Sequence, residues 1–224
     1  MSWAEVFKIN SNMKKPLNEQ IRDIKVLPIR IITSSTTYTP EKSGWYKIIC
    51  VGAGADSYGF IGSSTTSKIY TSGGCAGGVA IKVLKLSKSV SHTVSIGSSA
   101  SFKYTDGGVE KTILAEGGVP GYYDLSDGSS PSTPGTASGG DYNYTGGQAS
   151  GSTSKSSAYY QGASVGVYLT ELIPQDTSRN GLKYGNGILC YGGGASAQRD
   201  TYDSVTTNEG QPSAVIIIPL EMEE

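Results

Sequence analysis

The chain has 224 residues, of which 31 are glycine, about twice the usual share of ~7%. Hydrophobic residues make up 37% of the chain and charged residues only 17%, which excludes a simply disordered low-complexity tract and indicates an ordered fold of an unusual kind. The formal net charge is −1, so no basic surface is expected to release counterions from phosphate, and nucleic acid is not an expected partner.

Neither export nor membrane insertion is expected from the sequence. Residues 1–8 lack the basic region, apolar stretch and cleavage site of a secretory signal. The longest apolar run, residues 214–218, is far too short to cross a bilayer. The cysteines Cys50, Cys75 and Cys190 are odd in number and widely spaced, so we expect each to be a small buried hydrophobe in a protein that folds in a reducing cytosol.

Residues 1–37 are predicted to be a separate N-terminal segment for attachment or oligomerisation, because they contain almost no glycine and most of the early basic residues. Pro16 suits the first turn of a helix. Apolar residues then recur at helical spacing, namely at Leu17, Ile21 and Ile24. We therefore expect a short helix over residues 17–25. An alternative is that this helix docks on the protein's own domain.

Residues 38–224 are predicted to form one glycine-rich domain that is mainly β. Before it, residues 26–32 suit an extended edge strand interrupted by Pro28, and residues 34–40 are expected to be a polar linker. The expected strands are residues 44–51, 79–86, 90–96 and 213–220, with a hairpin over 102–114 that turns at Asp106-Gly107. The first and last of these strands are the most apolar. We expect them to pair and to close a small β scaffold from which the glycine-rich middle projects.

Paired glycines recur between residues 52 and 194. Ordering a glycine costs more backbone entropy than ordering any other residue, so a folded domain should use it heavily only where no Cβ fits. We therefore expect main chain to pack directly against main chain. Glycines three apart, as at Gly74 and Gly77, would face neighbouring extended left-handed helices with three residues per turn. The alternative, on composition alone, is a flexible linker.

Tyrosine argues against a linker, because the chain holds 15 tyrosines and only 3 phenylalanines, and many tyrosines lie in the glycine-rich middle. Tyrosine offers a large amphipathic contact area with few torsions to freeze, while serine, glycine and asparagine supply adaptable hydrogen bonds. This mixture favours a recognition surface, although about half of the tyrosines are expected to pack inside the domain. The candidate receptor-binding residues are Tyr122, Tyr123, Tyr142, Tyr144, Tyr159 and Tyr160.

Several short motifs stand in a particular order along the chain. Val51-Gly-Ala-Gly54 follows a strand, Gly73-Gly-Cys-Ala-Gly-Gly78 opens the next, and Val94-Ser-Ile-Gly97 comes after it. Further Gly-Gly loops lead to Tyr191-Gly-Gly-Gly194 and a closing strand at 210–219. In this order the motifs resemble the glycine-rich domain of bacteriophage tail fibres, over roughly residues 38–224.

That resemblance implies stacked polyglycine II helices that present variable loops to the host surface, as in the distal adhesins of T-even phages. It also implies a homotrimer, because tail fibres are commonly trimers. Residues 7–18 are similar to the openings of tail proteins from phages or phage-like particles that infect clostridia.

Two catalytic or nucleotide-binding motifs are incomplete in this chain. Gly52-Ala-Gly54 lacks the third glycine and the following helix of a dinucleotide-binding fingerprint. Gly162-Ala-Ser164-Val-Gly166 matches the nucleophile elbow of hydrolases, but the histidine of such enzymes comes later in the chain, whereas His92 lies upstream. We interpret Ser164 as a turn residue and His92 as an ordinary strand residue.

No cofactor or metal is expected. Asp124 and Asp127, or Asp141 and Asn143, offer oxygen ligands but lack the length and the closing glutamate of an EF-hand loop. Side chains of this type more commonly cap turns by bonding nearby backbone amides.

The expected function is that of a non-enzymatic receptor-binding protein at the tip of a phage tail or a tail-like bacteriocin. Its N-terminus would contact other tail or baseplate proteins, and its glycine-rich domain would bind a saccharide or a protein on the bacterial surface. One alternative is a structural baseplate component that contacts only other virion proteins. A second is an envelope polysaccharide depolymerase, which would need two acids meeting in a cleft.

Overall fold

The computed structural model describes residues 27–61, 69–120, 122–124, 128–130, 132–149, 151–152, 159–160, 175–176, 183–184, 191–192, 194, 197–201, 204–206 and 209–222. Within these residues the secondary structure is all β, with no helix, which confirms the expected fold class. The helix predicted over residues 17–25 lies outside the described residues.

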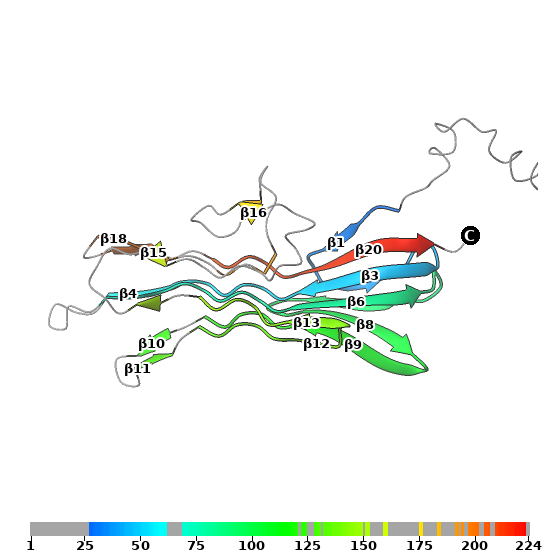
Figure 1. The fold of residues 1–224 in the computed structure, drawn as a ribbon, viewed down its shortest axis with the longest axis horizontal. Coiled ribbons are helices and arrows are strands. Elements are labelled where there is room, and N and C mark those ends of the chain that lie inside the picture. Colours follow the sequence, from blue (N-terminus) through cyan, green and yellow to red (C-terminus); the bar gives the residue numbers. More distant parts are fainter. Residues whose placement is uncertain are drawn as a thin grey trace, which may run out of the picture.

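The first large sheet is antiparallel and has the strand order β1-β20-β3-β6-β13 (Figure 1). Its strands are β1 (Arg30–Ile32), β20 (Ala214–Met222), β3 (Gly44–Val51), β6 (Val79–Leu86) and β13 (Tyr142–Tyr144). The expected pairing of the two most apolar strands is confirmed, because β20 runs antiparallel to β3 from Ala214 opposite Val51 to Met222 opposite Gly44. The expected edge strand near Pro28 is β1, which pairs only with β20.

The second large sheet is also antiparallel, with the order β12-β9-β8-β7-β2. Its strands are β12 (Ala137–Ser138), β9 (Val109–Ala115), β8 (Ala100–Asp106), β7 (His92–Ile96) and β2 (Thr36–Tyr38). The predicted hairpin is formed by β8 and β9. β1 belongs to the first sheet and β2 to the second. Since β2 spans residues 36–38, the predicted domain boundary between residues 37 and 38 falls inside this strand.

Two local predictions are wrong. The polar linker expected over residues 34–40 contains β2. Its polar sequence does not indicate a strand, but β2 pairs with β7, which supplies its backbone hydrogen bonds. The turn of the hairpin is Gly107-Gly108, with φ angles of 59° and 79°, while Asp106 is the last residue of β8 and pairs with Val109. Two consecutive positive φ angles suit the primed turns that match the twist of a hairpin, and two glycines supply them without strain.

The hydrophobic core lies between the two large sheets. The first sheet contributes side chains of β3 such as Tyr46 and Ile48, and the second contributes Phe102 and Ile113, all of them fully buried. Cys50 belongs to the same core, and its burial raises the pKa of the thiol far above the usual value, which confirms it as a small buried hydrophobe. The two sheets therefore form a sandwich.

The first sheet is apolar on its other face as well. Alternate residues of its central strands form a second cluster, made of Ile49, Val51, Val79, Ile81 and Ile216. Because both faces of β3 bury apolar side chains, residues 48–51 form the continuous apolar stretch within the run from which a buried strand was predicted.

The remaining strands form small sheets, and most of them lie at the far end of the molecule from the sandwich (Figure 1). One has the order β14-β5-β4, another β15-β18-β19, and β10 pairs with β11 as β16 does with β17. Their bounds are β4 (Tyr58–Ile61), β5 (Ile69–Ser72), β10 (Tyr122–Asp124), β11 (Gly128–Ser130), β14 (Gly151–Ser152), β15 (Tyr159–Tyr160), β16 (Gln175–Asp176), β17 (Lys183–Tyr184), β18 (Ala197–Thr201) and β19 (Ser204–Thr206). In Figure 1 the labels β4, β10, β11, β15 and β18 mark this distal end.

Candidate functional site

Between the sandwich and the distal strands the chain passes through a set of extended segments that we call the glycine lattice. It comprises residues 52–55, 74–78, 97–98, 116–119, 133–136, 146–147 and 210–212, together with Gly192 and Gly194. In Figure 1 such segments run side by side along the long axis. They connect the two groups of strands, so their packing decides how firmly the distal end is held.

The glycines of the lattice allow backbones to touch. A Cβ atom added at most of them would lie well under 3.0 Å from a carbonyl oxygen of another segment, a distance that real Cβ atoms essentially never show. This is true of Gly52, Gly74, Gly77, Gly78, Gly117, Gly118, Gly135, Gly146, Gly194 and Gly210. The expectation that main chain packs directly against main chain is therefore confirmed for the described residues.

Hydrogen bonds from one segment of the lattice go to several neighbours in turn. The amide groups of residues 52, 53, 54 and 55 donate to the carbonyl oxygens of Gly78, Ser98, Gln211 and Cys75, at 3.0, 2.9, 2.8 and 2.8 Å. The first and the fourth donors therefore bond the same neighbouring segment, and the two between them bond two others. The partner repeats every third residue.

A second segment repeats this pattern. Glu116 donates to Thr136 at 2.7 Å and Val119 donates to Thr133 at 2.8 Å, so residues 116 and 119 bond the same neighbour. Between them, Gly118 donates to the carbonyl oxygen of Ala53 at 2.8 Å. Residues 52–55 bond three neighbouring segments, whereas a strand in a flat sheet bonds at most two, so the lattice is cross-linked in more than one direction.

A few buried side chains also join the segments. The Sγ atom of Cys75 lies 3.0 Å from the hydroxyl of Ser132 and accepts from Nε2 of Gln148 and from the amide of Ala149, both at 3.3 Å. The Ser132 hydroxyl also donates to the Gly73 carbonyl at 3.2 Å. Cys75 is fully buried as predicted, but it bonds polar groups rather than packing as a hydrophobe. Cys190 lies outside the described residues.

The candidate tyrosines fall into two groups along the chain's long axis. Tyr122 and Tyr123 lie in β10, paired with Ser130 and Ser129 of β11, at the distal end (Figure 1). Tyr159 and Tyr160 form β15, which pairs with β18 at the same end. β18 in turn lies against β5, and β19 against β4, so two of the small sheets are neighbours there.

Tyr142 and Tyr144 lie instead in β13, at the edge of the first large sheet (Figure 1). Tyr142 is 60% exposed, whereas Tyr144 is partly buried and packs against the second apolar cluster, beside Tyr191. The structure thus brings four of the six candidates to one end of the molecule and leaves two at the sandwich. The sequence does not reveal this division, because it depends on which strand each tyrosine pair joins.

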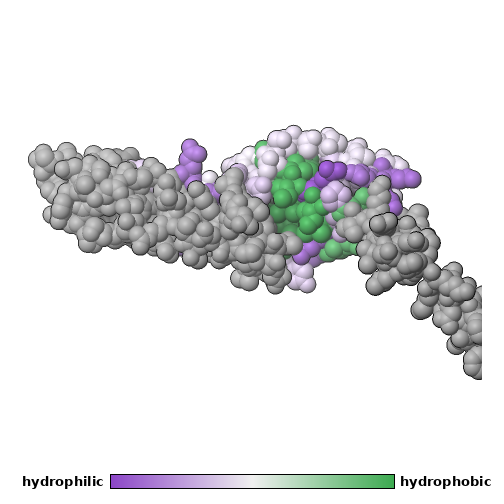
Figure 2. Space-filling model, turned by 90° about the horizontal axis from the view of Figure 1, so that it is seen from above, coloured by the Kyte–Doolittle hydropathy of each residue, from purple (hydrophilic) through white to green (hydrophobic). Residues whose placement is uncertain are grey.

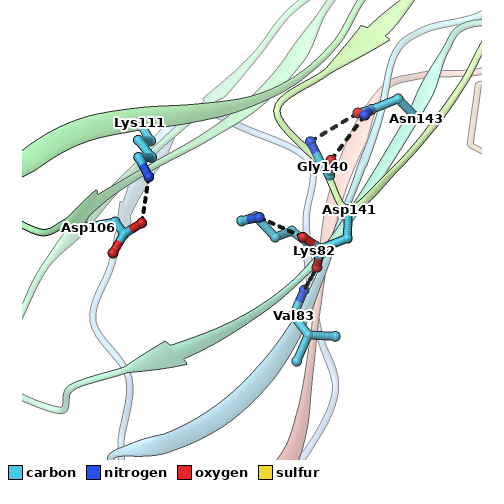
Figure 3. Close-up of polar contacts among 7 residues, drawn as sticks. All are labelled: Lys82, Val83, Asp106, Lys111, Gly140, Asp141 and Asn143. Carbon is cyan, nitrogen blue, oxygen red and sulfur yellow. Dashed lines mark hydrogen bonds and ion pairs between the residues drawn. The ribbon is translucent and has the colours of Figure 1, made fainter.

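The acidic and amide side chains around β13 make local structural bonds (Figure 3). Asp141 accepts from Nζ of Lys82 at 2.7 Å and from the amide of Val83 at 3.0 Å. The hydrogen bond from Lys82 lowers the pKa of Asp141 and in return raises the pKa of Lys82. Asn143 bonds both the amide and the carbonyl of Gly140, each at 3.0 Å. The bonds of Asn143 match the capping role expected for it, whereas Asp141 bonds Lys82 and Val83 of the neighbouring strand β6 instead of amides near it in sequence.

A second ion pair joins the two strands of the hairpin (Figure 3). Lys111 of β9 lies 2.5 Å from the carboxylate of Asp106 in β8, and this hydrogen bond lowers the pKa of Asp106. Both side chains are largely exposed, so the pair contributes little stability by itself.

The candidate catalytic residues are not brought together among the described residues. His92 is buried in β7, where its ring stacks on Phe102 with centroids 5.2 Å apart. Burial lowers its pKa, and its Nε2 atom has no hydrogen-bond partner. It is a strand residue, as expected. Ser164 and Asp127 lie outside the described residues, and Asp124 is the last residue of β10.

Among the described residues no three histidine, cysteine, aspartate or glutamate side chains are grouped so that they could hold a metal ion. No helix in that part of the chain is long and apolar enough to cross a membrane. Comparisons of the chain with protein-family models, with curated proteins and with solved structures find no match.

Proposed function

We propose that this chain is a non-enzymatic receptor-binding protein of a phage tail or a tail-like bacteriocin, which recognises a saccharide or protein on the bacterial surface. The observation that carries the proposal is the glycine lattice, in which cross-linked main chain extends from a β sandwich to an end that bears paired tyrosines. A framework of this kind holds aromatic contact residues in place before the receptor arrives, which lowers the entropy cost of binding.

We further propose that the lattice segments are polyglycine II helices. A helix of this type has three residues per turn, so its amide groups point to three neighbours in rotation. Residues 52–55 and 116–119 have this period in their hydrogen-bond partners.

The N-terminal segment, residues 1–37, is proposed to join the domain to other tail or baseplate proteins. The assembled protein is proposed to be a homotrimer. Several weak sites on one particle raise avidity through effective concentration, so modest affinity at each distal end is sufficient for adsorption. The protein would be made in the bacterial cytoplasm and act in the virion or particle.

A cell-binding assay with the purified full-length chain tests the proposal. Fluorescently labelled protein is mixed with a panel of clostridial and other bacterial strains, and bound protein is measured before and after competition with envelope fractions of each strain. Binding to at least one strain, lost on competition with its envelope, is expected. Binding to no strain, together with binding to isolated tail or baseplate proteins, would instead favour the structural component. Release of reducing ends from the envelope would favour the depolymerase.

A further inference from the structure

The first large sheet exposes apolar side chains on the face that points away from the sandwich core. Ile216 belongs to the second apolar cluster, on the face away from the sandwich core. β1 places Ile31 opposite Ile216, so Ile31 lies on the same face. A neighbouring row runs across three strands as Ile218, Lys47 and Val83. We call the apolar residues here the outer patch: Ile29, Ile31, Trp45, Val83 and Ile218.

The outer patch is unusually exposed for its composition. Four of its side chains are between 41% and 52% exposed, and Ile218 is partly buried. Seen from the side of β1 and β20, hydrophobic residues gather over the sheets in Figure 2. Contiguous apolar surface of this kind on a soluble domain marks a place where another element packs.

The chain itself supplies an element of the right kind next to the patch. Residues 1–26 precede the described structure, and the chain enters the first sheet at Arg30, directly after Ile29 of the patch. The preceding residues repeat apolar side chains at helical spacing, at Leu17, Ile21 and Ile24. A helix this short is marginal in water unless its apolar face is packed, so it needs a partner surface.

The dimensions of the two elements match. Going from β1 to β6 crosses three strand spacings of about 4.8 Å, which is about 14 Å. A helix over residues 17–25 is about 13 Å long at ~1.5 Å per residue. Residues 26–29 join the helix to β1, and Lys47 can lay its aliphatic stem beneath the helix with the ammonium in water.

We propose that the outer patch is the docking site of the chain's own residues 17–25, with Leu17, Ile21 and Ile24 against the sheet. A second copy of the chain fits the same surface less well. Lys47 lies in the middle of the patch and forms no ion pair with a described residue, so a face-to-face contact between copies would bring two lysines together. This proposal does not depend on the proposed function, and it leaves residues 1–16 for contacts with the particle.

Tryptophan fluorescence tests the proposal in the full-length chain. The chain has two tryptophans, so Trp3→Phe leaves Trp45 in the patch as the only one. In this background, Leu17→Ser, Ile21→Ser and Ile24→Ser together remove the apolar stripe. Asn18→Ser, Glu19→Ser and Arg22→Ser are the matched control, because they change the opposite face of the helix and leave the net charge unchanged. The measurements are the emission maximum and the acrylamide quenching of Trp45.

The stripe variant is expected to shift the emission to longer wavelength and to raise the quenching constant, while the control matches the parent. Equal quenching in all three proteins would overturn the proposal. The proposal would also be overturned if Trp45 of the stripe variant stayed protected from acrylamide and lost this protection on dilution. A second copy of the chain would then cover the patch. Thermal unfolding of each variant checks that the sandwich is intact.

A change in the patch itself gives an independent readout. Val83→Glu is expected to speed cleavage by trypsin after Arg22 and Lys25, because the segment leaves the sheet. Val109→Glu is the control, since Val109 is 61% exposed at the hairpin turn, away from the patch. The same cleavage rate in both variants and the parent would contradict the docking.

Discussion

Gly77 and Gly97 differ in the space around them, and this difference predicts opposite effects of one added methyl group. A Cβ on Gly77 would collide with the backbone carbonyl of Gly52, which cannot rotate away as a side chain can. No atom lies within 4 Å of a Cβ on Gly97, and its φ is outside the left-handed region. The lattice therefore needs glycine at one position and merely contains it at the other.

Gly77→Ala is expected to lower the free energy of unfolding by about 1–3 kcal/mol, the usual cost of forcing extra atoms into a packed interior. Gly97→Ala is expected to be neutral or to stabilise by up to about 1 kcal/mol, because alanine restricts the unfolded chain. Urea unfolding followed by circular dichroism measures both. Equal stability of the two variants would mean that the lattice does not pack as described.

The titration of His92, in the core of the sandwich, makes the free energy of unfolding depend on pH. Its folded pKa lies below the ordinary value of 6.5 because burial disfavours the charged ring. The unfolded chain therefore binds a proton at a higher pH than the folded chain does, and the free energy of unfolding must fall as pH drops below about 6.5. The loss continues until the pH reaches the lowered folded pKa.

Thermal unfolding between pH 7.5 and pH 5 is expected to show this loss in the parent chain. His92→Phe keeps a flat ring against Phe102 and removes the titrating group, so its stability should change less over that range. The acids with lowered pKa, Asp106 and Asp141, lose their contribution only at lower pH, below 3.8. A variant with the same pH dependence as the parent would assign the effect to another group.

At the scale of elements, the hairpin of β8 and β9 isolates the effect of backbone conformation. Gly107 and Gly108 both have positive φ, and a Cβ at either would meet no atom within 4 Å. Any cost of substitution there comes from the left-handed conformation alone.

Gly107→Val is expected to lower the free energy of unfolding by about 1–2 kcal/mol, the usual cost of a left-handed L-residue. Gly107→Asn should cost less, because asparagine followed by glycine is favoured in turns of this type. Urea unfolding of the two variants makes the comparison. If valine were tolerated as well as asparagine, the turn in solution would differ from the one described.

An element was predictable from the sequence when the residues that indicate it lie within the element itself. β3 and β6 were predicted with their observed bounds, because β3 is largely apolar, β6 alternates, and each is flanked by glycine or by polar residues. β2 was missed, because Thr36-Thr37-Tyr38 is a polar edge strand whose partner lies far along the chain. The sequence also predicted that glycines would be packed against main chain, but not which segments would meet, since a glycine has no side chain to indicate its neighbours.

The candidate site also has features that the sequence predicted and features that it did not. The tyrosine pairs were recognisable from composition, but their separation into a distal group and a pair at β13 was not. The polar bonds of Cys75 were missed for a similar reason, because Ser132 and Gln148 are 57 and 73 residues away in sequence. Contacts of this range come from the path of the whole lattice.

At the scale of the whole molecule, the lattice joins a sandwich with a conventional core to an end formed of short strands. Its hydrogen bonds cross between segments from the middle of the chain and from residues 210–212 near the C-terminus. Loosening any one segment therefore withdraws partners from several others. If the distal end binds a receptor, tyrosines there should matter more than Tyr142, the exposed tyrosine at the sandwich.

We expect alanine at Tyr122, Tyr123, Tyr159 and Tyr160 together to abolish adsorption to a strain that the parent protein binds, because four aromatic contacts leave one end of the molecule. Tyr142→Ala is the control. Tyr142 is 60% exposed but lies on β13 beside the sandwich, so this variant should adsorb as the parent does. Flow cytometry with labelled protein measures adsorption, and thermal unfolding of each variant confirms the sandwich.

The opposite result would relocate the binding surface. If Tyr142→Ala removes adsorption and the four distal substitutions do not, the receptor binds at the edge of the first sheet. The distal strands would then have a role other than receptor binding. If the distal substitutions weaken adsorption only in part, removing one pair at a time separates the β10 hairpin from β15. These strands belong to different small sheets, so each pair can be lost without changing the partner strand of the other.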